Sequence, residues 1–457
     1  MKYAYLMGGM VLLLLLGAPS ILAAECSSTP TDGCTISSSK TLELTPGTYI
    51  LPNGITIAAP DVTLDCKGAT LKGTKQTGSV GITITSNAQN RTTVRNCVLD
   101  KYVVGMRALN SLSEGLIELN QITDSINGIL IETDSIEPIV STKTIIQDNT
   151  LTLDGTGGTS RAIYLFFADN NNITRNTISN TPKGILLDFS SANMIEENTI
   201  SLTQAGVEIG GNSGNILFNN NVHDNGVGIR LDGSTGNNKI EGNSIESNGI
   251  GAHVKTSSDN SIMGNTFSSN TDKGLVIGFG TGDSISNNNL VYENNFIANT
   301  KSAIDDGNNN WNNTKIGNYW SEYGPAQCKD DNFNNICDQP FDVNGGKNFA
   351  GDAGQGATTA VDYLPQTGQF SSIPPPQIIP INDIAISEGD NVVITVDADG
   401  YSLPLTYAIT NPNFVVNDTV LTWQTNFADA ENYGSHEEVV VVTNEYGIKS
   451  TENVTIT

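Results

Sequence analysis

One short segment carries oxygen-bearing side chains at alternate positions, a spacing that suits a calcium ion. It lies between Cys328 and Cys337, and its candidate ligands are Asp330, Asn332, Asn334, the Ile336 carbonyl and Asp338. Alternation lets one loop surround a hard cation with oxygen, and a disulfide between the flanking cysteines would hold the loop closed. Two of the ligands are neutral amides and no glutamate completes the set. A structural calcium site of weak affinity is therefore expected, and a polar capping loop held by a disulfide is the alternative.

Acidic side chains suited to polysaccharide cleavage are dispersed along the chain. Hydrolysis of a glycosidic bond needs two or three carboxylates around that bond. Asp305 and Asp306 are adjacent, but a solvated turn explains them, and Glu118, Asp154 and Asp188 would contribute only if the fold brought them to one face. No catalytic residue is therefore predicted.

Copper is not favoured as a cofactor, because copper prefers histidine, methionine or thiolate ligands. The chain has three histidines. His223 and His253 stand at different positions of a repeat, which places them on different sides of the molecule, and His436 lies beyond the repeats.

Aromatic side chains in two places are candidates for stacking against sugar rings. Tyr164, Phe166 and Phe167 interrupt one repeat, and Trp311, Tyr319, Trp320 and Tyr323 cluster after the last one. In the second cluster, we expect Trp320 or Tyr319 to plug the last repeat, so that a cap is the alternative to a ligand site.

A repeat with a base period of 22 residues positions these side chains. Each unit carries an asparagine followed two residues later by an apolar residue, then a glycine before alternating apolar residues such as Gly184-Ile185-Leu186-Leu187, then a third short strand. The repeat asparagines are Asn96, Asn120, Asn149, Asn176, Asn198, Asn220, Asn243, Asn265 and Asn294. We expect them to form a ladder at one corner of stacked coils, through amide hydrogen bonds between coils and a tolerance of left-handed backbone.

Three strands and three turns fill 22 residues and leave no space for an α-helix. Leucine-rich repeats need more leucine, and propeller blades need about 40 residues. The fold class that remains is all-β: a right-handed parallel β-helix of about twelve coils, in which each coil contacts only its neighbours. The β-helix is predicted over residues 25–366, with a cap at each end.

The chain begins with an apolar run and a small-residue cleavage site, which predict a signal peptide over residues 1–24. Six cysteines follow, and their positions predict three disulfides: Cys26 with Cys34, Cys66 with Cys97, and Cys328 with Cys337. No second stretch is long enough to span a bilayer. We therefore expect a secreted, extracellular or cell-surface protein, periplasmic if the cell has an outer membrane.

The pattern changes after the repeats. A proline-rich linker is predicted over residues 367–379, followed by longer alternating strands that predict a small immunoglobulin-like β-sandwich over residues 380–457. No cysteine pair of the antibody type is present in it.

The repeats, the Leu64-Asp65-Cys66-Lys67-Gly68 step and the closing Gly317-Asn318-Tyr319-Trp320-Ser321 and Asp362-Tyr363-Leu364-Pro365 segments resemble the NosD-type family of exported parallel β-helix proteins. The resemblance covers roughly residues 45–365 and implies the fold more than the function.

The formal net charge of −26 would repel nucleic acid and anionic lipid. The leading hypothesis is a secreted or cell-surface scaffold that binds glycans or partner proteins along one face of the rod. The second hypothesis is a polysaccharide-cleaving lyase or glycoside hydrolase.

Overall fold

The structure is a computed structural model of the 457-residue chain. It describes residues 23–456 except 89, 110–111, 133–142, 155–157, 234–235, 279–285, 333, 345–359, 371–376, 379–380, 383, 385–390, 397, 400–404, 412, 418, 425–435 and 444–448. The predicted signal peptide lies almost entirely outside the described residues. Within the described part, no helix is long and apolar enough to cross a bilayer.

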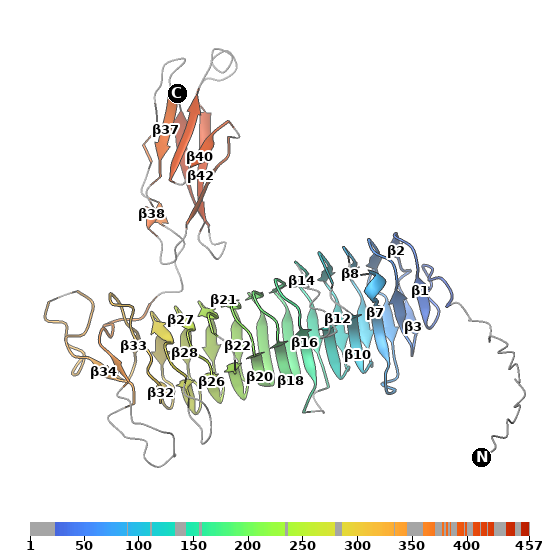
Figure 1. Cartoon of the computed structure of the whole chain (residues 1–457), viewed down its shortest axis with the longest axis horizontal. Helices are drawn as coiled ribbons and strands as arrows, with labels where there is room; N and C mark the ends of the chain where they lie inside the picture. Colours follow the sequence, from blue (N-terminus) through green and yellow to red (C-terminus); the bar gives the residue numbers. More distant parts are fainter. Residues whose placement is uncertain are drawn as a thin grey trace, which may run out of the picture.

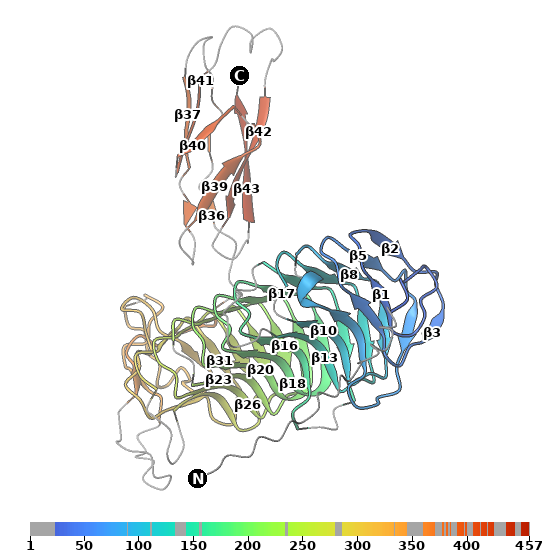
Figure 2. The ribbon, with the colours of Figure 1, turned by 45° about the vertical axis from the view of Figure 1, so that its right-hand side comes forward.

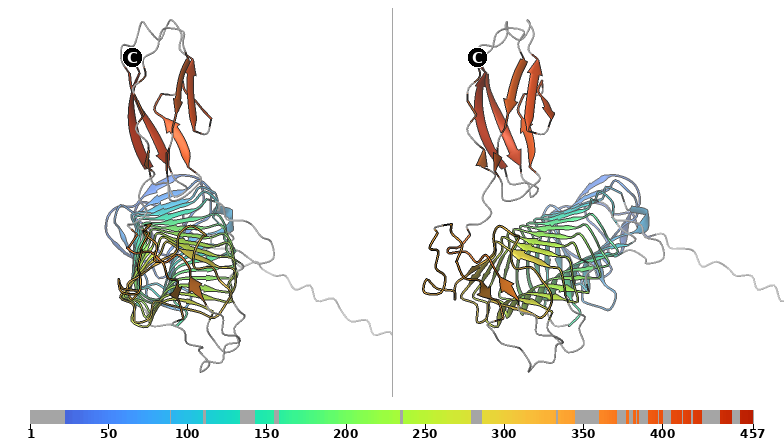
Figure 3. Two further views of the ribbon diagram at one scale, coloured as in Figure 1. Left: turned by 90° about the vertical axis from the view of Figure 1, so that its left-hand side faces the viewer. Right: turned by 60° about the vertical axis from the view of Figure 1, so that its left-hand side comes forward.

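Coils of parallel β-strands stack into a rod, which confirms the predicted parallel β-helix (Figure 1). Each coil contributes one strand to each of three faces, and in Figure 3 the coils lie one behind another. The described helical content of the rod is a single 3-10 turn, η1 (Ser86–Ala88).

The longest strands form face A. They are β1 (Cys34–Ile36), β4 (Ile55–Ile57), β7 (Val80–Ile84), β10 (Val104–Leu109), β13 (Asn127–Glu132), β16 (Arg161–Phe166), the C-terminal halves of β18 (Thr177–Asp188) and β20 (Thr199–Gly210), β23 (Val227–Asp232), β26 (Ile250–Lys255), β29 (Lys273–Ile277) and β32 (Ala303–Asp305).

Shorter strands form faces B and C. Face B comprises β3 (Thr48–Ile50), β6 (Thr70–Lys72), β9 (Val98–Asp100), β12 (Gln121–Thr123), β15 (Thr150–Thr152), the N-terminal halves of β18 and β20, β22 (Asn221–His223), β25 (Ser244–Glu246), β28 (Thr266–Ser268), β31 (Asn295–Ile297) and β33 (Tyr319–Trp320). Face C comprises β2 (Thr41–Glu43), β5 (Thr63–Asp65), β8 (Thr93–Arg95), β11 (Leu116–Glu118), β14 (Ile145–Gln147), β17 (Asn172–Thr174), β19 (Met194–Glu196), β21 (Ile216–Phe218), β24 (Lys239–Glu241), β27 (Ser261–Met263) and β30 (Leu290–Tyr292). Its eleven strands are close to the twelve coils expected.

Strand alternation sends one row of side chains from each face into the rod. On face C this row includes Ile146, Ile173, Ile195 and Leu217, each fully buried and in register with the next. Because successive side chains point to opposite sides of a strand, the flanking residues face outward. Figure 2 shows the resulting continuous stack, whose hydrophobic core runs along the rod.

Asparagine ladders bind the coils together at the corners. In the predicted ladder, both the backbone N–H and the side-chain amide of each residue donate to the next side-chain oxygen, as from Asn176 to Asn198 at 2.9 and 3.0 Å. Asn120 to Asn294 all take part, and the ladder continues to Asn318. Two further ladders were not predicted: one includes Asn171, Asn193, Asn215, Asn238, Asn260, Asn289 and Asn309, and the other Asn225, Asn248, Asn270 and Asn299.

Two parts of the ladder prediction were wrong. Asn96 is not a member: its side chain binds Asp65, and Cys97 takes the ladder position by donating its N–H to Asn120. The sequence alignment slips by one residue in that coil. The left-handed backbone also belongs to the residue before each ladder asparagine, such as Arg175 before Asn176. The corner is therefore turned by whichever residue precedes the asparagine, while the amide supplies the hydrogen bonds.

Disulfides and aromatic side chains close the rod. All three predicted cysteine pairs are bonded, with Cα separations of 4.8–5.0 Å. At the C-terminal end Phe296, Trp320 and Phe341 stack inside the last coil, with centroid separations of 4.4 and 4.3 Å. Asp305 is buried there and accepts hydrogen bonds from the Trp311 indole, the Gly307 N–H and the Asn309 amide, so the prediction of a solvated turn at Asp305 was wrong.

Antiparallel strands follow the rod. β34 (Phe341–Asp342) pairs with β35 (Val361–Asp362) in the cap. The C-terminal module contains a pair, β36 (Gln377–Ile378) and β38 (Ala398–Asp399), and two three-stranded sheets. These are formed by β37 (Asn391–Thr395), β41 (Val420–Gln424) and β40 (Val415–Asn417), and by β39 (Thr406–Ile409), β42 (His436–Thr443) and β43 (Lys449–Ile456). The sheets of a sandwich are present, and its immunoglobulin-like character stays a prediction. Most of the predicted linker's proline-rich part lies outside the described residues.

Candidate functional site

The three acids that would serve a hydrolase do not converge. Glu118 lies on face C, Asp154 binds Lys75 at the corner after β15, and Asp188 ends the face-A part of β18. His223 and His253 lie on faces B and A, as expected.

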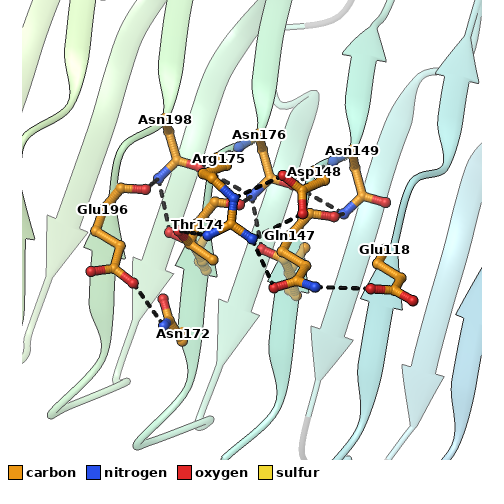
Figure 4. A network of polar contacts seen from close by, with 12 residues as sticks. Glu118, Gln147, Asp148, Asn149, Asn172, Thr174, Arg175, Asn176, Glu196 and Asn198 are labelled. Atoms are coloured by element: carbon orange, nitrogen blue, oxygen red, sulfur yellow. Dashed lines mark hydrogen bonds and ion pairs between the residues drawn. The ribbon is translucent and has the colours of Figure 1, made fainter. Parts of the chain in front are cut away.

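Glu118 belongs to a brace that crosses the coils of face C (Figure 4). It accepts a hydrogen bond of 2.8 Å from Gln147, and Gln147 accepts one of 3.1 Å from Arg175. Arg175 also binds both carboxylate oxygens of Asp148 at 2.9 Å. Because each group is already satisfied by a neighbouring coil, this network holds the rod together and is not a candidate site.

The predicted calcium loop has its ligand side chains turned toward its own backbone. The Asp330 carboxylate accepts from the N–H groups of Asn334 and Asn335 at 3.0 and 2.9 Å. Asn334 accepts from Ile336 N–H, and Asp338 from Asp331 N–H. The turns fix the loop, and calcium binding by it stays a prediction. Cys328 and Cys337 close the loop, as both interpretations required.

The cysteines and His253, which are side chains of the kinds that copper prefers, are engaged in other contacts. All six cysteines are in disulfides, and His253 directs Nε2 toward the Gly278 carbonyl at 3.1 Å. Burial lowers the pKa of His253, which favours its neutral form. Within the described residues, no three His, Cys, Asp or Glu side chains form a group that would hold a metal ion.

The strongest candidate site is the outer side of face A near the middle of the rod. Strand register aligns its outward side chains in three rows across successive coils. One row contains Leu130, Tyr164, Leu186, Glu208, Arg230 and His253; the second contains Glu132, Phe166, Asp188, Gly210, Asp232 and Lys255; the third contains Arg161, Lys183, Ala205 and Val227. We call this surface the outer patch.

Four aromatic side chains form a shelf along one edge of the outer patch, and exposure increases along it from buried Tyr164 through partly exposed Phe166 and Phe167 to exposed Phe189. Tyr164 and Phe166 stack at 5.9 Å between centroids, Phe166 meets Phe167 edge-on at 4.5 Å, and Phe167 stacks on Phe189 at 5.1 Å. Phe167 and Phe189 both have left-handed backbone, with φ of 51° and 50°, which is rare for so bulky a residue. Phe189 remains 56% exposed, so this conformation presents an aromatic ring to solvent.

The next coil leaves the shelf open. Gly210 and Gly211 follow Asp188 and Phe189 in the stack, and a Cβ at these positions would lie 3.1 Å from the Asp188 carboxylate and 3.2 Å from the Phe189 ring. Any larger residue would crowd both groups. The two glycines therefore keep the carboxylate and the ring accessible from that side.

Asp188 sits at the centre of the polar part. Its carboxylate accepts a hydrogen bond of 3.3 Å from the Tyr164 hydroxyl. Burial raises the pKa of Asp188, against the opposing influence of Lys183, and burial also raises the pKa of Tyr164. A carboxyl group with a raised pKa beside a phenol is an arrangement suited to proton transfer.

Ion pairs organise the remaining charges. Lys183 binds Glu208 at 2.8 Å, and Arg230 binds Asp232 at 2.5 Å. The Arg161 guanidinium lies over the Tyr164 ring, 4.1 Å from its centroid. The buried Nε atoms of Arg161 and Arg230 have no hydrogen-bond partner among the described residues.

An open hollow of about 520 Å3 lies where the same coils turn from face B into face A. It is lined by Leu153, Asp154, Asn180, Thr181, Pro182, Leu202, Thr203 and Gln204. Its volume is in the range of small-ligand sites. Pro182 adjoins Lys183, so the hollow and the shelf are at opposite ends of the same face-A strand.

The sequence indicated only part of this site. Tyr164, Phe166 and Phe167 stood out because they interrupt a repeat, and Asp188 was noted as an acid. Phe189 and the pairing of Lys183 with Glu208 were missed, because the repeat alignment follows apolar positions and not the outward residues between them. The two adjacent glycines at 210 and 211 were the available signal.

Comparison with known proteins supports the fold and leaves the activity open. Residues 133–278 match the family model described as "Periplasmic copper-binding protein (NosD)", about a third of the chain. No curated protein matches.

Among solved structures, a mannuronan C-5 epimerase A-module from Azotobacter vinelandii is 14% identical, covering 59% of this chain and 89% of that one, with a TM-score of 0.46. A tailspike protein of an E. coli bacteriophage, solved with a pentasaccharide, is 9% identical over 58% and 57%, with a TM-score of 0.44. An exopolygalacturonase from Thermotoga maritima is 11% identical over 60% and 84%, with a TM-score of 0.40. At identities of 9–14% and TM-scores of 0.40–0.46, these likenesses carry no inference about the activity of this chain.

Proposed function

We propose that this protein is an exported β-helix rod that binds a polysaccharide across the outer patch of face A. The observation that carries the proposal is the aromatic shelf beside Asp188 and Arg161. Over these coils, the outward side chains differ from coil to coil while the interior repeats. A surface needed only for solubility has no reason to expose Phe189 in a left-handed conformation.

The chemistry of the patch matches a chain of sugars. The apolar faces of pyranose rings stack on aromatic rings, and their hydroxyl groups bind carboxylates, guanidinium groups and amides. The hollow at the other end of the strand offers Asn180 and Gln204 beside Leu202. A face-A strand segment of six residues spans about 20 Å, enough for several sugar units.

A partner protein at the cell surface is the other occupant consistent with the scaffold hypothesis, since aromatic residues are also enriched in protein interfaces. The partly exposed charged pairs of the patch favour glycan, because a protein interface of standard size would need a larger apolar centre than this shelf.

Catalysis is the second candidate, on one specific observation. The Tyr164 hydroxyl and the Asp188 carboxyl are in contact, and burial raises both of their pKa values. A carboxyl group with a raised pKa is a candidate general acid for a glycosidic oxygen, and the Tyr164 hydroxyl would orient it.

A binding screen combined with an activity assay tests the proposal. The wild type and a Phe167→Ala/Phe189→Ala double variant are applied to a polysaccharide array, and each ligand found is incubated with protein and assayed for reducing ends and for unsaturated products. Tyr363→Ala is the matched control, because this aromatic residue is 66% exposed in the cap, away from the patch.

We expect the double variant to lose binding and the control to keep it. If the double variant still binds the polysaccharide, the aromatic shelf is not part of the binding site. If the wild type cleaves a polysaccharide and Asp188→Asn does not, the function is enzymatic and not binding alone.

A further inference from the structure

The distribution of charge on face A differs from that of the whole chain. The chain carries 22 basic and 48 acidic residues. The outward rows from β10 to β26 instead hold five basic and four acidic side chains: Arg107, Arg161, Lys183, Arg230 and Lys255, and Glu132, Asp188, Glu208 and Asp232. Basic and acidic side chains are therefore nearly balanced on this surface of a chain that is strongly acidic overall.

Two of these basic residues occupy directly paired strand positions. Strand register pairs Arg161 of β16 with Lys183 of β18, on neighbouring coils. Like charges at directly opposed positions of a sheet destabilise it. Glu208 binds Lys183, and no described carboxylate forms an ion pair with Arg161. The folded chain thus places an arginine and a lysine at paired positions of neighbouring coils, and the carboxylate that binds Lys183 comes from β20, on the far side of β18 from Arg161.

The orientation of Arg161 also favours the binding of an anion. Its guanidinium is held over the Tyr164 ring at 4.1 Å, and its buried Nε lacks a partner among the described residues. A planar guanidinium fixed in this way has donors directed for a bidentate contact with a carboxylate. The arrangement becomes favourable when an anion binds between Arg161 and Lys183.

We propose that Arg161 and Lys183 form an anion subsite within the outer patch, and that the polysaccharide is acidic, with the carboxylate of a uronate residue in that subsite. This inference rests on the proposed glycan site and adds the class of sugar. The uronate ring then lies beside Tyr164 and the aromatic shelf. Glu208 binds Lys183, and Arg161, which forms no ion pair with a described carboxylate, supplies the second positive charge.

Calorimetric titration with three oligosaccharides tests the subsite. The probes are an oligogalacturonate, the same oligosaccharide with its carboxyl groups reduced to alcohols, and a sulfated oligosaccharide of similar length. We expect the wild type to bind the oligogalacturonate at least tenfold more tightly than its reduced form, and to lose this preference at high salt, because the contact is ionic.

Single substitutions test whether the preference for the oligogalacturonate arises at Arg161 and Lys183. Arg161→Gln and Lys183→Gln should each weaken oligogalacturonate binding about tenfold and leave binding of the reduced form unchanged, and Arg161→Lys should be intermediate because it keeps the charge without the fork. Arg91→Gln is the matched control: this arginine pairs with Asp61 and is exposed, in the loop between η1 and β8. Thermal unfolding confirms that each variant is folded.

The outcomes separate the two proposals. Equal affinity for the acidic and reduced oligosaccharides would overturn the anion subsite and leave the glycan site standing. Preference for the sulfated probe over the oligogalacturonate would overturn the assignment to uronate. Absence of binding to all three, together with a negative array, would overturn both proposals.

Discussion

The corner ladders and the outer patch are built from the same coils and differ in how they change along the rod. At the ladder, Asn176, Asn198 and Asn220 repeat one set of hydrogen bonds in each coil. At the patch, the row through Tyr164 changes from Leu130 to Leu186, Glu208 and Arg230. Both sets of positions are equally periodic in the fold.

The difference separates stabilising positions from candidate ligand-binding ones. A ladder position has the same surroundings in every coil, so one residue type satisfies all of them. The outward positions of the patch range from buried Leu186, 1% exposed, to exposed Phe189, 56% exposed, so their surroundings differ from coil to coil. A local cluster of aromatic and charged groups there has no explanation in the repeat itself. Departures from the repeat on the outer surface are therefore the places to look for function in such a rod.

Removing one ladder amide gives the largest effect on stability. The Asn198 side chain donates to Ile173 O, Glu196 O and Asn220 Oδ1, and accepts from Asn176. Asn198→Ala leaves several buried groups without partners, and we expect the free energy of unfolding to fall by about 4 kcal/mol. Denaturant unfolding measures this, with Asn308→Ala as an exposed control. Equal effects in the two variants would mean that the ladders do not stabilise the rod.

The buried carboxyl group of the cap predicts an unusual dependence on pH. Burial raises the pKa of Asp362 from 3.8 to about 6, although it accepts hydrogen bonds from Trp320, Asn318 and Leu364. Because the native state binds this proton more tightly than the unfolded chain, its contribution to stability is complete below about pH 4 and is lost as the pH rises through 6. The loss amounts to about 3 kcal/mol.

Asp362→Asn removes this titration. The difference in unfolding free energy between wild type and variant should therefore shift by about 3 kcal/mol in favour of the variant from pH 4 to pH 7. Denaturant unfolding across this range measures it, with the exposed Asp259→Asn as control. A pH-independent difference would contradict the raised pKa.

Calcium should stabilise the C-terminal cap to a smaller extent. With the weak affinity of extracellular modules, about 0.1–1 mM, a concentration of about 5 mM calcium adds about 1–2 kcal/mol by mass action. Thermal unfolding with calcium and with chelator measures this in the wild type and in Asp330→Ala. Asp331→Ala is the control, since this neighbouring side chain is outside the candidate ligand set. If calcium leaves the wild-type midpoint unchanged, the loop is only a polar cap.

The smallest effect on stability is expected at the aromatic shelf. Phe189→Asn removes an exposed ring and places a residue that tolerates left-handed backbone at φ 50°, so the free energy of unfolding should change by no more than about 0.5 kcal/mol. The same change should remove the ring on which Phe167 stacks and weaken polysaccharide binding. A large loss of stability would show that the shelf serves the rod and would weaken the proposed site.

The sequence by itself determined the architecture, because its period, its glycines and its apolar alternation are local properties repeated many times. It also indicated the disulfide pairs and the aromatic plug at Trp320. The sequence placed the ladder one residue off at Asn96 and Cys97, where the repeat is imperfect, and placed the left-handed backbone one residue late at the other corners. Nothing local distinguishes a ladder residue from the left-handed residue before it.

Only the tertiary structure decided which outward side chains meet. The sequence does not distinguish Glu118, Asp154 and Asp188. The stack of coils places Glu118 in the hydrogen-bonded brace on face C, Asp154 in an ion pair with Lys75, and Asp188 in the outer patch. Arg161 and Lys183 are 22 residues apart and become neighbours because one coil separates them. Such contacts depend on the register of coils and on insertions between them, so the chemistry of the surface follows from the stack and not from any single repeat.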